Sequence, residues 1–425
     1  MNLFKIFSES KALGFVKEAY TFLDSSTFDS KILRCVSSGL KRVYPTALFD
    51  FVDRKNQGQK SMFAKNIFSP IVIVPLIYAL FLSLSTYRVS NLALLTIAAG
   101  LIFFYFGYRL SNFSFEHVQL DSDTRRIGVF LFYTGLFFLT LDLLHAGEIP
   151  LFSPSARGRL VVSYTMITQL IPPGGIFIIA WFGAEHKKGR LDIRSARVNA
   201  FLTLFVTVLL ISSLGFRTQI IVALLGGFIA MYLTGLVGFV EVLFGLGFAG
   251  LGIAGLGYYR AVVQGSPIAF SEVLGARIGL TLSVFDYLVQ RFMPFGANKG
   301  YTLLATFSSF IPGIPGPRLG PRTIVARLFG IVGISVTSTL LGTVVLDFGI
   351  VGVVLFMLLL GHVLGTCYRA AKTGAPIAVG VYAVLLAYTI VGIETGLVDF
   401  NVVIMFLAGY LLIRTSASKY KAGMG

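Results

Sequence analysis

The sequence has few charged residues, few cysteines and few histidines. Only 13% of its 425 residues are charged, and its two cysteines, Cys35 and Cys367, lie far apart. Two distant cysteines exclude a disulfide framework and a cysteine metal cage. The four histidines are scattered, so we expect no metal site and no cofactor. The first residues lack the short charged head and small-residue cleavage site of a signal peptide, and we expect no cleaved leader.

Hydrophobic residues make up 56% of the chain, and its mean hydropathy is +0.83. A soluble fold cannot bury so much apolar surface, so the composition predicts an all-α, polytopic transmembrane protein. Apolar runs of about 17 to 25 residues predict about ten spans, at 68–86, 91–109, 127–144, 161–183, 198–213, 219–236, 237–259, 340–366, 375–393 and 398–413.

Basic residues predict how these spans are oriented. Residues 1–67 carry eleven Lys and Arg, and the loop 184–197 carries five. Because cytoplasmic loops are enriched in Lys and Arg, we expect a plasma-membrane protein with both termini in the cytoplasm. The expected parts are a basic N-terminal segment at 1–67, a transmembrane domain at 68–414 and a tail at 415–425.

The outer loops of this topology contain arginine but almost no lysine. Thirteen of the fourteen lysines lie on the inner side, and Lys299 is the exception. Guanidinium groups bind carboxylate and phosphate oxygens in pairs, which an ammonium group does not. The alternative is that these arginines lie at helix ends and contact lipid headgroups. The ten outer arginines are Arg88, Arg157, Arg159, Arg217, Arg260, Arg277, Arg291, Arg318, Arg322 and Arg327.

The long outer loop, 260–330, has two halves. "FSEVLGARIGLTLSVFDYLVQRF" predicts an amphipathic helix with Arg277 and Arg291 on one face and Asp286 almost opposite Arg277. The prolines and glycines of "IPGIPGPRLGPRTIVARLFG" predict an extended segment over the membrane surface. The apolar stretch 324–337 is too short for a span, and we expect it not to cross.

Two features within the spans depart from simple apolar helices. "QLIPPGGIF", residues 169–177, places two adjacent prolines in one span, which predicts a broken or kinked helix. The carboxylates of Glu241, Asp347 and Glu394 lie at or within apolar runs. Charges there are costly, so each of these groups has either a functional role or a paired structural one.

Three motifs resemble one known family. "HAGEIPLFSPSARGR", residues 145–159, resembles the outer loop of oligosaccharide repeat-unit polymerases, and "LGFRT", at 214–218, resembles their Gly-x-Arg-Thr motif. "STLLGTVVLDFGIVGVVLFMLLLG", at 338–361, is similar to a late span shared with O-antigen ligases. The matches follow the family's order and cover roughly residues 140–365.

The resemblance implies a Wzy-like O-antigen polymerase with a GT-C-like fold. Such a metal-independent glycosyltransferase would polymerise polyprenyl-diphosphate-linked oligosaccharides at the outer membrane surface, and no nucleic acid is expected as a partner. Arginines would bind the diphosphate. Arg217 is the first candidate, Arg157 and Arg159 follow by resemblance, and the other candidates lie in the long loop: Arg260, Arg277, Arg291, Arg318 and Arg322.

The remaining assignments stay open. For the base that accepts the acceptor's proton, the candidates are Asp286, Glu272 and His145, while Asp347 is a base or orients an arginine. An O-antigen-ligase-like transferase and a flippase of lipid-linked oligosaccharides are the alternative functions. The sequence of residues 4–23 predicts an amphipathic patch that lies on membrane lipids or contacts a chain-length regulator. The alternative is that this segment is a solvated tail.

Overall fold

A computed structural model describes residues 67–111, 123–247, 250, 255, 270–308, 320–331, 335–397 and 399–422 of the chain. These residues form helices and no strand, so the predicted all-α class is confirmed. The helices are α6 (Pro70–Ser83), α7 (Asn91–Leu110), α8 (Asp123–Ala146), η1 (Pro154–Arg159), α9 (Val162–Thr168), α10 (Ile171–Lys187), α11 (Ile193–Ser212), α12 (Arg217–Leu233), α14 (Phe270–Phe292), α15 (Tyr301–Ser308), α16 (Pro321–Leu328), α17 (Thr339–Lys372), α18 (Pro376–Thr395) and α19 (Phe400–Ala422).

Most predicted spans coincide with apolar helices. Six stretches in the described part are long and apolar enough to cross a membrane: α7, α8, α9 with α10, α11, α17 and α18. Shorter apolar helices fall on the predicted spans at α6, α12 and α19. The remaining predicted span, 237–259, is helical over residues 239–247 and otherwise lies mostly outside the described residues. A polytopic membrane protein is therefore confirmed, and the count of ten spans stays a prediction.

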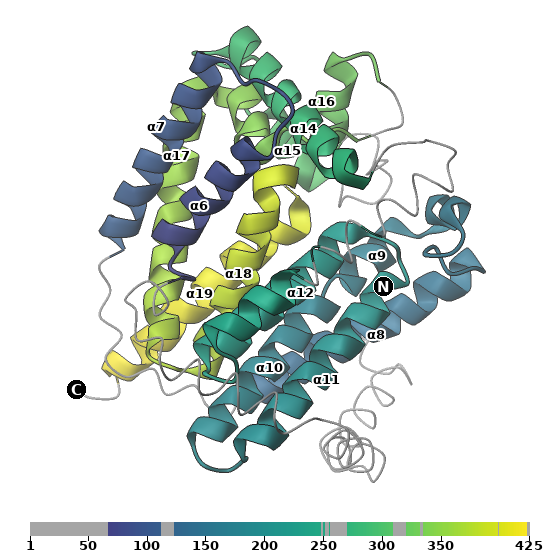
Figure 1. The fold of residues 1–425 in the computed structure, drawn as a ribbon, viewed down its shortest axis with the longest axis vertical. Helices are drawn as coiled ribbons and strands as arrows, with labels where there is room; N and C mark the ends of the chain where they lie inside the picture. Colours follow the sequence, from purple (N-terminus) through teal and green to yellow (C-terminus); the bar gives the residue numbers. More distant parts are fainter. Residues whose placement is uncertain are drawn as a thin grey trace, which may run out of the picture. The chain divides into compact units, whose positions relative to one another are not determined.

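The core of the bundle forms around α18, which is buried along almost its whole length. It packs against α10, α12 and α17 and, to a smaller extent, against α6 and α19. Figure 1 shows α18 between α17 and α12. Because α18 has no face left for lipid, its residues contact helices that are distant in the sequence.

Small residues let the backbones of α7 and α17 approach closely. A Cβ on Gly107 would lie 1.9 Å from the carbonyl oxygen of Leu358, and a Cβ on Gly361 would lie 2.1 Å from that of Phe104. These two helices run side by side in Figure 1. Glycine at such contacts allows the close helix packing that is common in membranes.

The predicted amphipathic helix is α14, which spans the quoted sequence from end to end. It packs on α17 and α7. The hydroxyl of Thr86, in the turn between α6 and α7, donates to the carbonyl of Gly275 over 3.3 Å. Helix α14 therefore lies at the same end of the bundle as the turn between α6 and α7, as the predicted topology requires.

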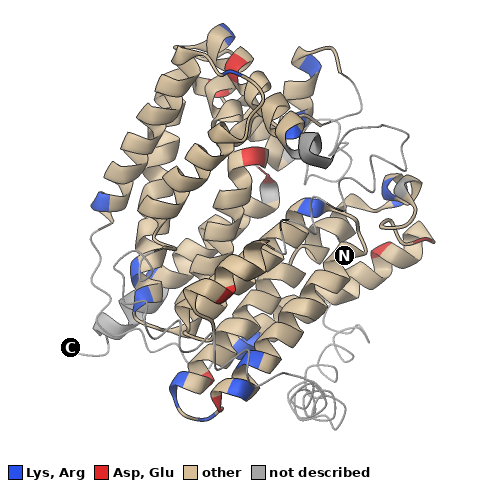
Figure 2. Ribbon diagram, viewed as in Figure 1, with Lys and Arg blue, Asp and Glu red and all other residues tan. Residues whose placement is uncertain are grey.

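The other loops predicted to face outside meet at this end as well. Arg277 of α14 pairs with Glu394 at the end of α18, and Arg322 of α16 pairs with Asp399, just before α19. In Figure 2 most charged segments lie near the ends of the helices. The alternation of helices thus gathers residues from distant loops at one membrane surface.

The stretch after the proline-rich segment does not cross the bundle. It contains α16, which has eight residues, and the amide of Val336 donates back to the carbonyl of Arg322 over 3.2 Å. An eight-residue helix covers about 12 Å, far less than the hydrocarbon thickness. The predicted interfacial position of residues 324–337 agrees with this return of the chain.

Candidate functional site

The loop after α8 packs on the turn between α11 and α12. The amide of Leu151 donates to the carbonyl of Ser213 over 3.0 Å. The short helix η1 then brings Arg157 over Gly215, where a Cβ would lie 2.6 Å from Nη2 of the guanidinium. Gly215 also has a φ of 70°, which glycine adopts without steric cost. Two motifs that lie far apart in the sequence are therefore in direct contact.

Arg157 is half-buried, and its guanidinium lacks a full set of partners among the described residues. Its Nε and Nη2 atoms are inaccessible to solvent and donate to no acceptor among the described residues. Burial lowers the pKa of Arg157 below its usual value, yet a guanidinium stays charged at any physiological pH. A buried donor without an acceptor is costly. Two such donors on one charged group favour an anionic ligand here.

Arg217 begins α12 and has a similar environment. Its Nε atom is buried and has no hydrogen-bond partner in the described part of the chain. The charges that act on Arg217 are those of Arg277, Glu394 and Arg157. Arg217 also lies at the first helical position, where the helix dipole favours an anion. Like charges have thus been brought together at the start of this helix.

Arg277 and Glu394 complete this group. The Nε atom of Arg277 donates to Oε1 of Glu394, and the exposed fractions of the two side chains are 47% and 26%. We call Arg157, Arg217, Arg277 and Glu394 the arginine cluster. Three guanidinium charges and one carboxylate charge give the cluster a net charge of +2, which matches an anion with two charges.

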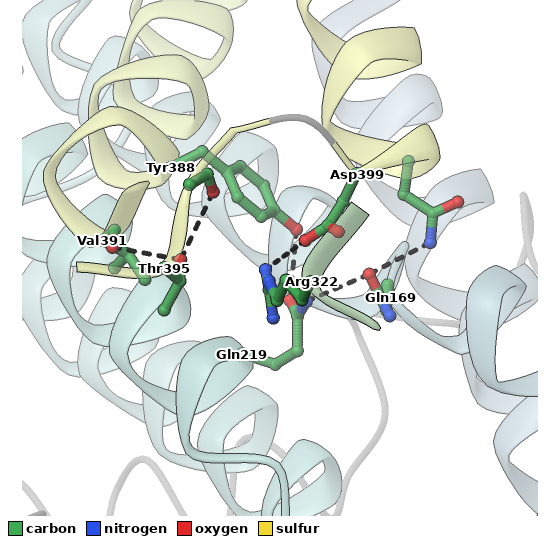
Figure 3. Close-up of polar contacts among 9 residues, drawn as sticks. Gln169, Gln219, Arg322, Tyr388, Val391, Thr395 and Asp399 are labelled. Carbon is green, nitrogen blue, oxygen red and sulfur yellow. Dashed lines mark hydrogen bonds and ion pairs between the residues drawn. The ribbon is translucent and has the colours of Figure 1, made fainter. Parts of the chain in front are cut away.

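A chain of polar side chains lies beside the first turn of α12 (Figure 3). Tyr388 donates from its hydroxyl to Oε1 of Gln219 over 3.1 Å. Nε2 of Gln219 donates to Oε1 of Gln169 over 3.0 Å, and Nδ2 of Asn401 donates to the same oxygen over 3.0 Å. Because buried polar groups need partners, this chain fixes α12 against α18, α19 and the junction of α9 with α10.

The predicted break in the span at 161–183 is confirmed. α9 ends at Thr168 and α10 begins at Ile171, because Pro172 and Pro173 have no amide hydrogen to continue the helix. The amide of Leu170 donates to Ile167 rather than to Met166. The freed carbonyl of Met166 instead accepts Nδ2 of Asn401 over 3.2 Å. A side chain of α19 thus replaces the helical hydrogen bond that is lost at the break.

Arg322, another predicted phosphate-binding residue, forms an ion pair with Asp399. Figure 3 shows this pair near Tyr388 and Gln219, and the charge of Asp399 acts on Tyr388. Arg322 is therefore at the same end of the bundle as the arginine cluster, with its charge balanced by a carboxylate. This ion pair joins α16 to the turn between α18 and α19.

The structure describes two of the other four arginines that were predicted to bind the diphosphate. Arg159 pairs with Glu148 over 3.0 Å, with about half of each side chain exposed, and Arg159 and Ser153 lower the pKa of Glu148 through hydrogen bonds. Arg291 is exposed in the last turn of α14. Arg260 and Arg318 lie outside the described residues.

Asp286 has a structural environment. Its carboxylate is buried and accepts the Tyr87 hydroxyl over 2.9 Å, the Ser90 amide over 3.1 Å and Nε2 of Gln290 over 3.2 Å, as well as the Ser90 hydroxyl. Burial acts to raise the pKa of Asp286, but the hydrogen bonds hold it below its usual value. Ser90 caps α7, so Asp286 ties α14 to the start of that helix.

Asp347 is also engaged by backbone amides. It is buried and accepts the amides of Thr302 over 3.0 Å and Leu303 over 2.8 Å, which caps the start of α15. Gly349 follows in a conformation with φ of 58°, and a Cβ there would lie 1.9 Å from the Pro294 carbonyl oxygen. Asp347 and Gly349 therefore join α17 to the outer loop.

Two base candidates, His145 and Glu272, and one carboxylate of the apolar runs, Glu241, remain to be placed. His145 is exposed in the last turn of α8, and Glu272 belongs to α14, with its side chain outside the described part. Glu241 pairs with Arg197 over 3.8 Å. Among the described residues, no group of three or more His, Cys, Asp or Glu side chains is arranged to hold a metal ion.

Sequence reasoning missed several polar residues of this region. Asp142 is buried and accepts the amide of Val161 over 2.8 Å and the Thr165 hydroxyl over 2.6 Å. The polar chain of Gln169, Gln219, Tyr388 and Asn401 was not anticipated either. Amide side chains within apolar spans were the available indication, since such groups are costly without partners.

Comparison with known proteins agrees with the motifs. A family model described as "Putative O-antigen polymerase" matches residues 66–406. An uncharacterised protein of Methanocaldococcus jannaschii is 30% identical over 322 residues, which cover 73% of this chain and 84% of that protein. No solved structure matches the chain.

Proposed function

Because the chain belongs to the O-antigen polymerase family, we propose that it is a membrane glycosyltransferase acting on polyprenyl-diphosphate-linked oligosaccharides. It transfers the growing glycan from its lipid diphosphate to the terminal sugar of another lipid-linked repeat unit. The observation that carries this proposal is the arginine cluster, in which guanidinium donors of Arg157 and Arg217 are buried and have no acceptor among the described residues. The diphosphate of the donor lipid fills that position.

The charge of the cluster supports a diphosphate diester as its ligand. A diphosphate between a lipid and a sugar carries one charge on each phosphorus, two in total, which equals the net +2 of the cluster. Guanidinium forks can bind its oxygens in pairs. As the glycosidic bond breaks, negative charge grows on the leaving oxygen, and preorganised cations stabilise that charge. The arginines thereby supply the stabilisation without a divalent ion.

The position of the cluster supports a transferase over a transporter. Arg157, Arg217 and Glu394 lie in a loop helix or at helix ends, and Arg277 lies within α14 and pairs with Glu394 at the same end of the bundle. We assign this end to the outer membrane surface. Transporters place their sites near the bilayer midplane between repeated halves. A surface site suits a substrate whose lipid stays in the membrane while its glycan extends into water.

Glycan length in a strain that lacks the gene tests this proposal. The strain is complemented with the wild-type gene, with Arg217→Lys, with Arg217→Ala or with the control Arg190→Ala, and membrane insertion is checked for each. Arg190 is an ion-paired arginine near the C-terminal end of α10, so its variant is expected to restore long chains. The lysine variant keeps the charge at position 217 but loses the fork.

We expect both Arg217 variants to leave mainly single repeat units. Long glycans in the strain without any copy of the gene would contradict the polymerase function. Accumulation of complete lipid-linked units on the cytoplasmic leaflet of that strain would indicate a flippase instead. Long chains with both Arg217 variants would contradict the role of the arginine cluster.

A further inference from the structure

Glu394 is the acidic member of the arginine cluster, and one of its oxygens has no hydrogen-bond partner among the described residues. Oε1 accepts Nε of Arg277, whereas Oε2 accepts no hydrogen bond from the described residues. The side chain is 26% exposed, so a substrate hydroxyl can reach it. Arg277 therefore fixes the orientation of the carboxylate and leaves one oxygen open beside the position of the diphosphate.

The position of Glu394 follows from the packing of α18 on α12. Tyr388 of α18 is level with Gln219 of α12, since the two are hydrogen-bonded. Glu394 follows Tyr388 by six residues on α18, which places it about 9 Å farther along the helix axis. On α12, Arg217 precedes Gln219 by only two residues. Glu394 is thus displaced from Arg217 toward the outer surface. An acceptor sugar approaching the diphosphate from water meets this carboxylate.

The buried carboxylates at this end have no such opening. Asp286 and Asp347 each accept two or more hydrogen bonds and are buried. Asp286 also lies nine residues from Arg277, about 13 Å along α14 and on another face, since it contacts α7 rather than α18. Asp399 is 39% exposed and, like Glu394, pairs through one oxygen, but its partner is Arg322 of α16 rather than an arginine of the cluster. Of these acidic side chains, Glu394 is the one whose charge acts on Arg217.

The charges during transfer provide a second argument. Before transfer, the +2 cluster faces a diphosphate diester with two negative charges. After transfer, the released lipid diphosphate has a terminal phosphate whose charge approaches −2, so the total approaches −3. If Glu394 takes up one proton in the same step, the cluster changes from +2 to +3. The net charge of the cluster then balances that of its ligand both before and after the transfer.

We propose that Glu394 is the proton acceptor of glycosyl transfer, a role that rests on the proposed function. The acceptor hydroxyl oxygen forms a bond to C1 of the donor sugar, and the bond between C1 and the diphosphate oxygen breaks. The electron pair of that bond stays on the diphosphate, and the hydroxyl proton moves to Oε2 of Glu394. Deprotonation of Glu394 by water then restores the cluster.

The test uses purified full-length protein in liposomes with lipid-diphosphate-linked repeat units from the host. Chain extension and binding of the donor lipid are measured separately for Glu394→Gln and for the control Glu185→Gln. Glu185 is also ion-paired to an arginine, Arg190, near the C-terminal end of α10. We expect Glu394→Gln to lower the extension rate by about 10²–10⁴-fold with donor binding unchanged or tighter, because one negative charge is removed. The control is expected to match wild type.

Chemical rescue separates a proton acceptor from a structural residue. Formate can enter the space left in Glu394→Ala and act as a small carboxylate base. We expect extension by this variant to increase with formate concentration, whereas Glu185→Ala shows no increase. A structural role would leave the lost activity unrecovered, and that result would overturn the inference.

The outcomes also separate this inference from the proposed function. Extension by Glu394→Gln within a few-fold of wild type, together with inactive Arg217→Ala, would overturn the role of Glu394 and leave the transferase intact. Parallel loss of donor binding and extension in Glu394→Gln would likewise overturn it. Activity in both Glu394→Gln and Arg217→Ala would overturn the inference and the proposed site together.

Discussion

The guanidinium of Arg157 lies on the α-carbon of Gly215, in the space that any other residue at position 215 would need for its Cβ. This contact explains why a glycine precedes Arg217 by two positions. It joins the loop after α8 to the start of α12 and sets how far apart Arg157 and Arg217 lie. Residue 215 is therefore a positioning residue for the arginine cluster.

Gly215→Ala is expected to reduce polymerisation more than it reduces stability. The left-handed conformation of residue 215, with φ of 70°, costs alanine roughly 1–2 kcal/mol. The new Cβ would lie 2.6 Å from Nη2 of Arg157, and the flexible arginine side chain moves away. We expect glycan extension to fall by about tenfold or more, since charged hydrogen bonds contribute about 1.5–3 kcal/mol.

Gly147→Ala is the matched control for this prediction. Gly147 has nearly the same conformation, with φ of 72°, and nothing lies within 4 Å of its Cβ position. Thermal unfolding in detergent is expected to show similar losses of stability for the two variants. Equal extension rates for the two variants would show that displacement of Arg157 has no consequence for transfer.

Asp286→Asn is expected to destabilise the protein without abolishing substrate binding. The carboxylate accepts hydrogen bonds from Tyr87, Ser90 and Gln290, and an amide presents two hydrogens to these donors. Because hydrogen bonds to charged groups contribute about 1.5–3 kcal/mol, we expect a loss of about 2 kcal/mol or more. Asp192→Asn is the control, since Asp192 caps α11 and asparagine caps a helix equally well.

The pH dependence of this effect has a defined sign. The folded-state pKa of Asp286 is lowered relative to about 3.9 in an unfolded chain. The stabilisation is therefore fully present above the unfolded value and is lost as the pH falls through the folded value. The difference in Tm between wild type and Asp286→Asn should stay constant from pH 7 to 5 and shrink at lower pH. A difference that grows on acidification would contradict this account.

Asn401→Ala is expected to weaken the junction between α9 and α10. The variant removes the donor to the Met166 carbonyl and to Gln169, so part-buried acceptors lose this partner at a cost of about 1 kcal/mol. Thermal unfolding measures this loss, with the exposed Asn91→Ala as control. A Tm equal to that of wild type would mean that the broken helix is stabilised without α19.

The helices were largely predictable from the sequence, because long apolar runs and two adjacent prolines have direct consequences in a membrane. α14 was predicted from its amphipathic pattern alone, and the break before Ile171 from Pro172 and Pro173. These features are local. Each depends on side chains within one segment and on the cost of unsatisfied backbone groups in lipid.

The site was predictable only in part, because its contacts join distant segments. Arg217 and Arg157 were candidates from their motifs, but the effect of the Arg277–Glu394 pair on Arg217 depends on how α12, α14 and α18 pack. The carboxylates show the same limit: Asp286 and Asp347 resembled bases by position, while the structure gives them helix-end partners. Glu394 was one acid among several until its pairing with Arg277 became visible.

Binding of the donor lipid to purified protein tests the central claim most directly. Affinities for a polyprenyl-diphosphate-linked oligosaccharide and for the corresponding monophosphate are compared in wild type, Arg157→Lys, Arg217→Lys and the control Arg190→Lys. We predict that wild type prefers the diphosphate and that each cluster variant binds it about tenfold or more weakly, with the control unchanged. Equal binding of the diphosphate by all four proteins would contradict a diphosphate site in the arginine cluster.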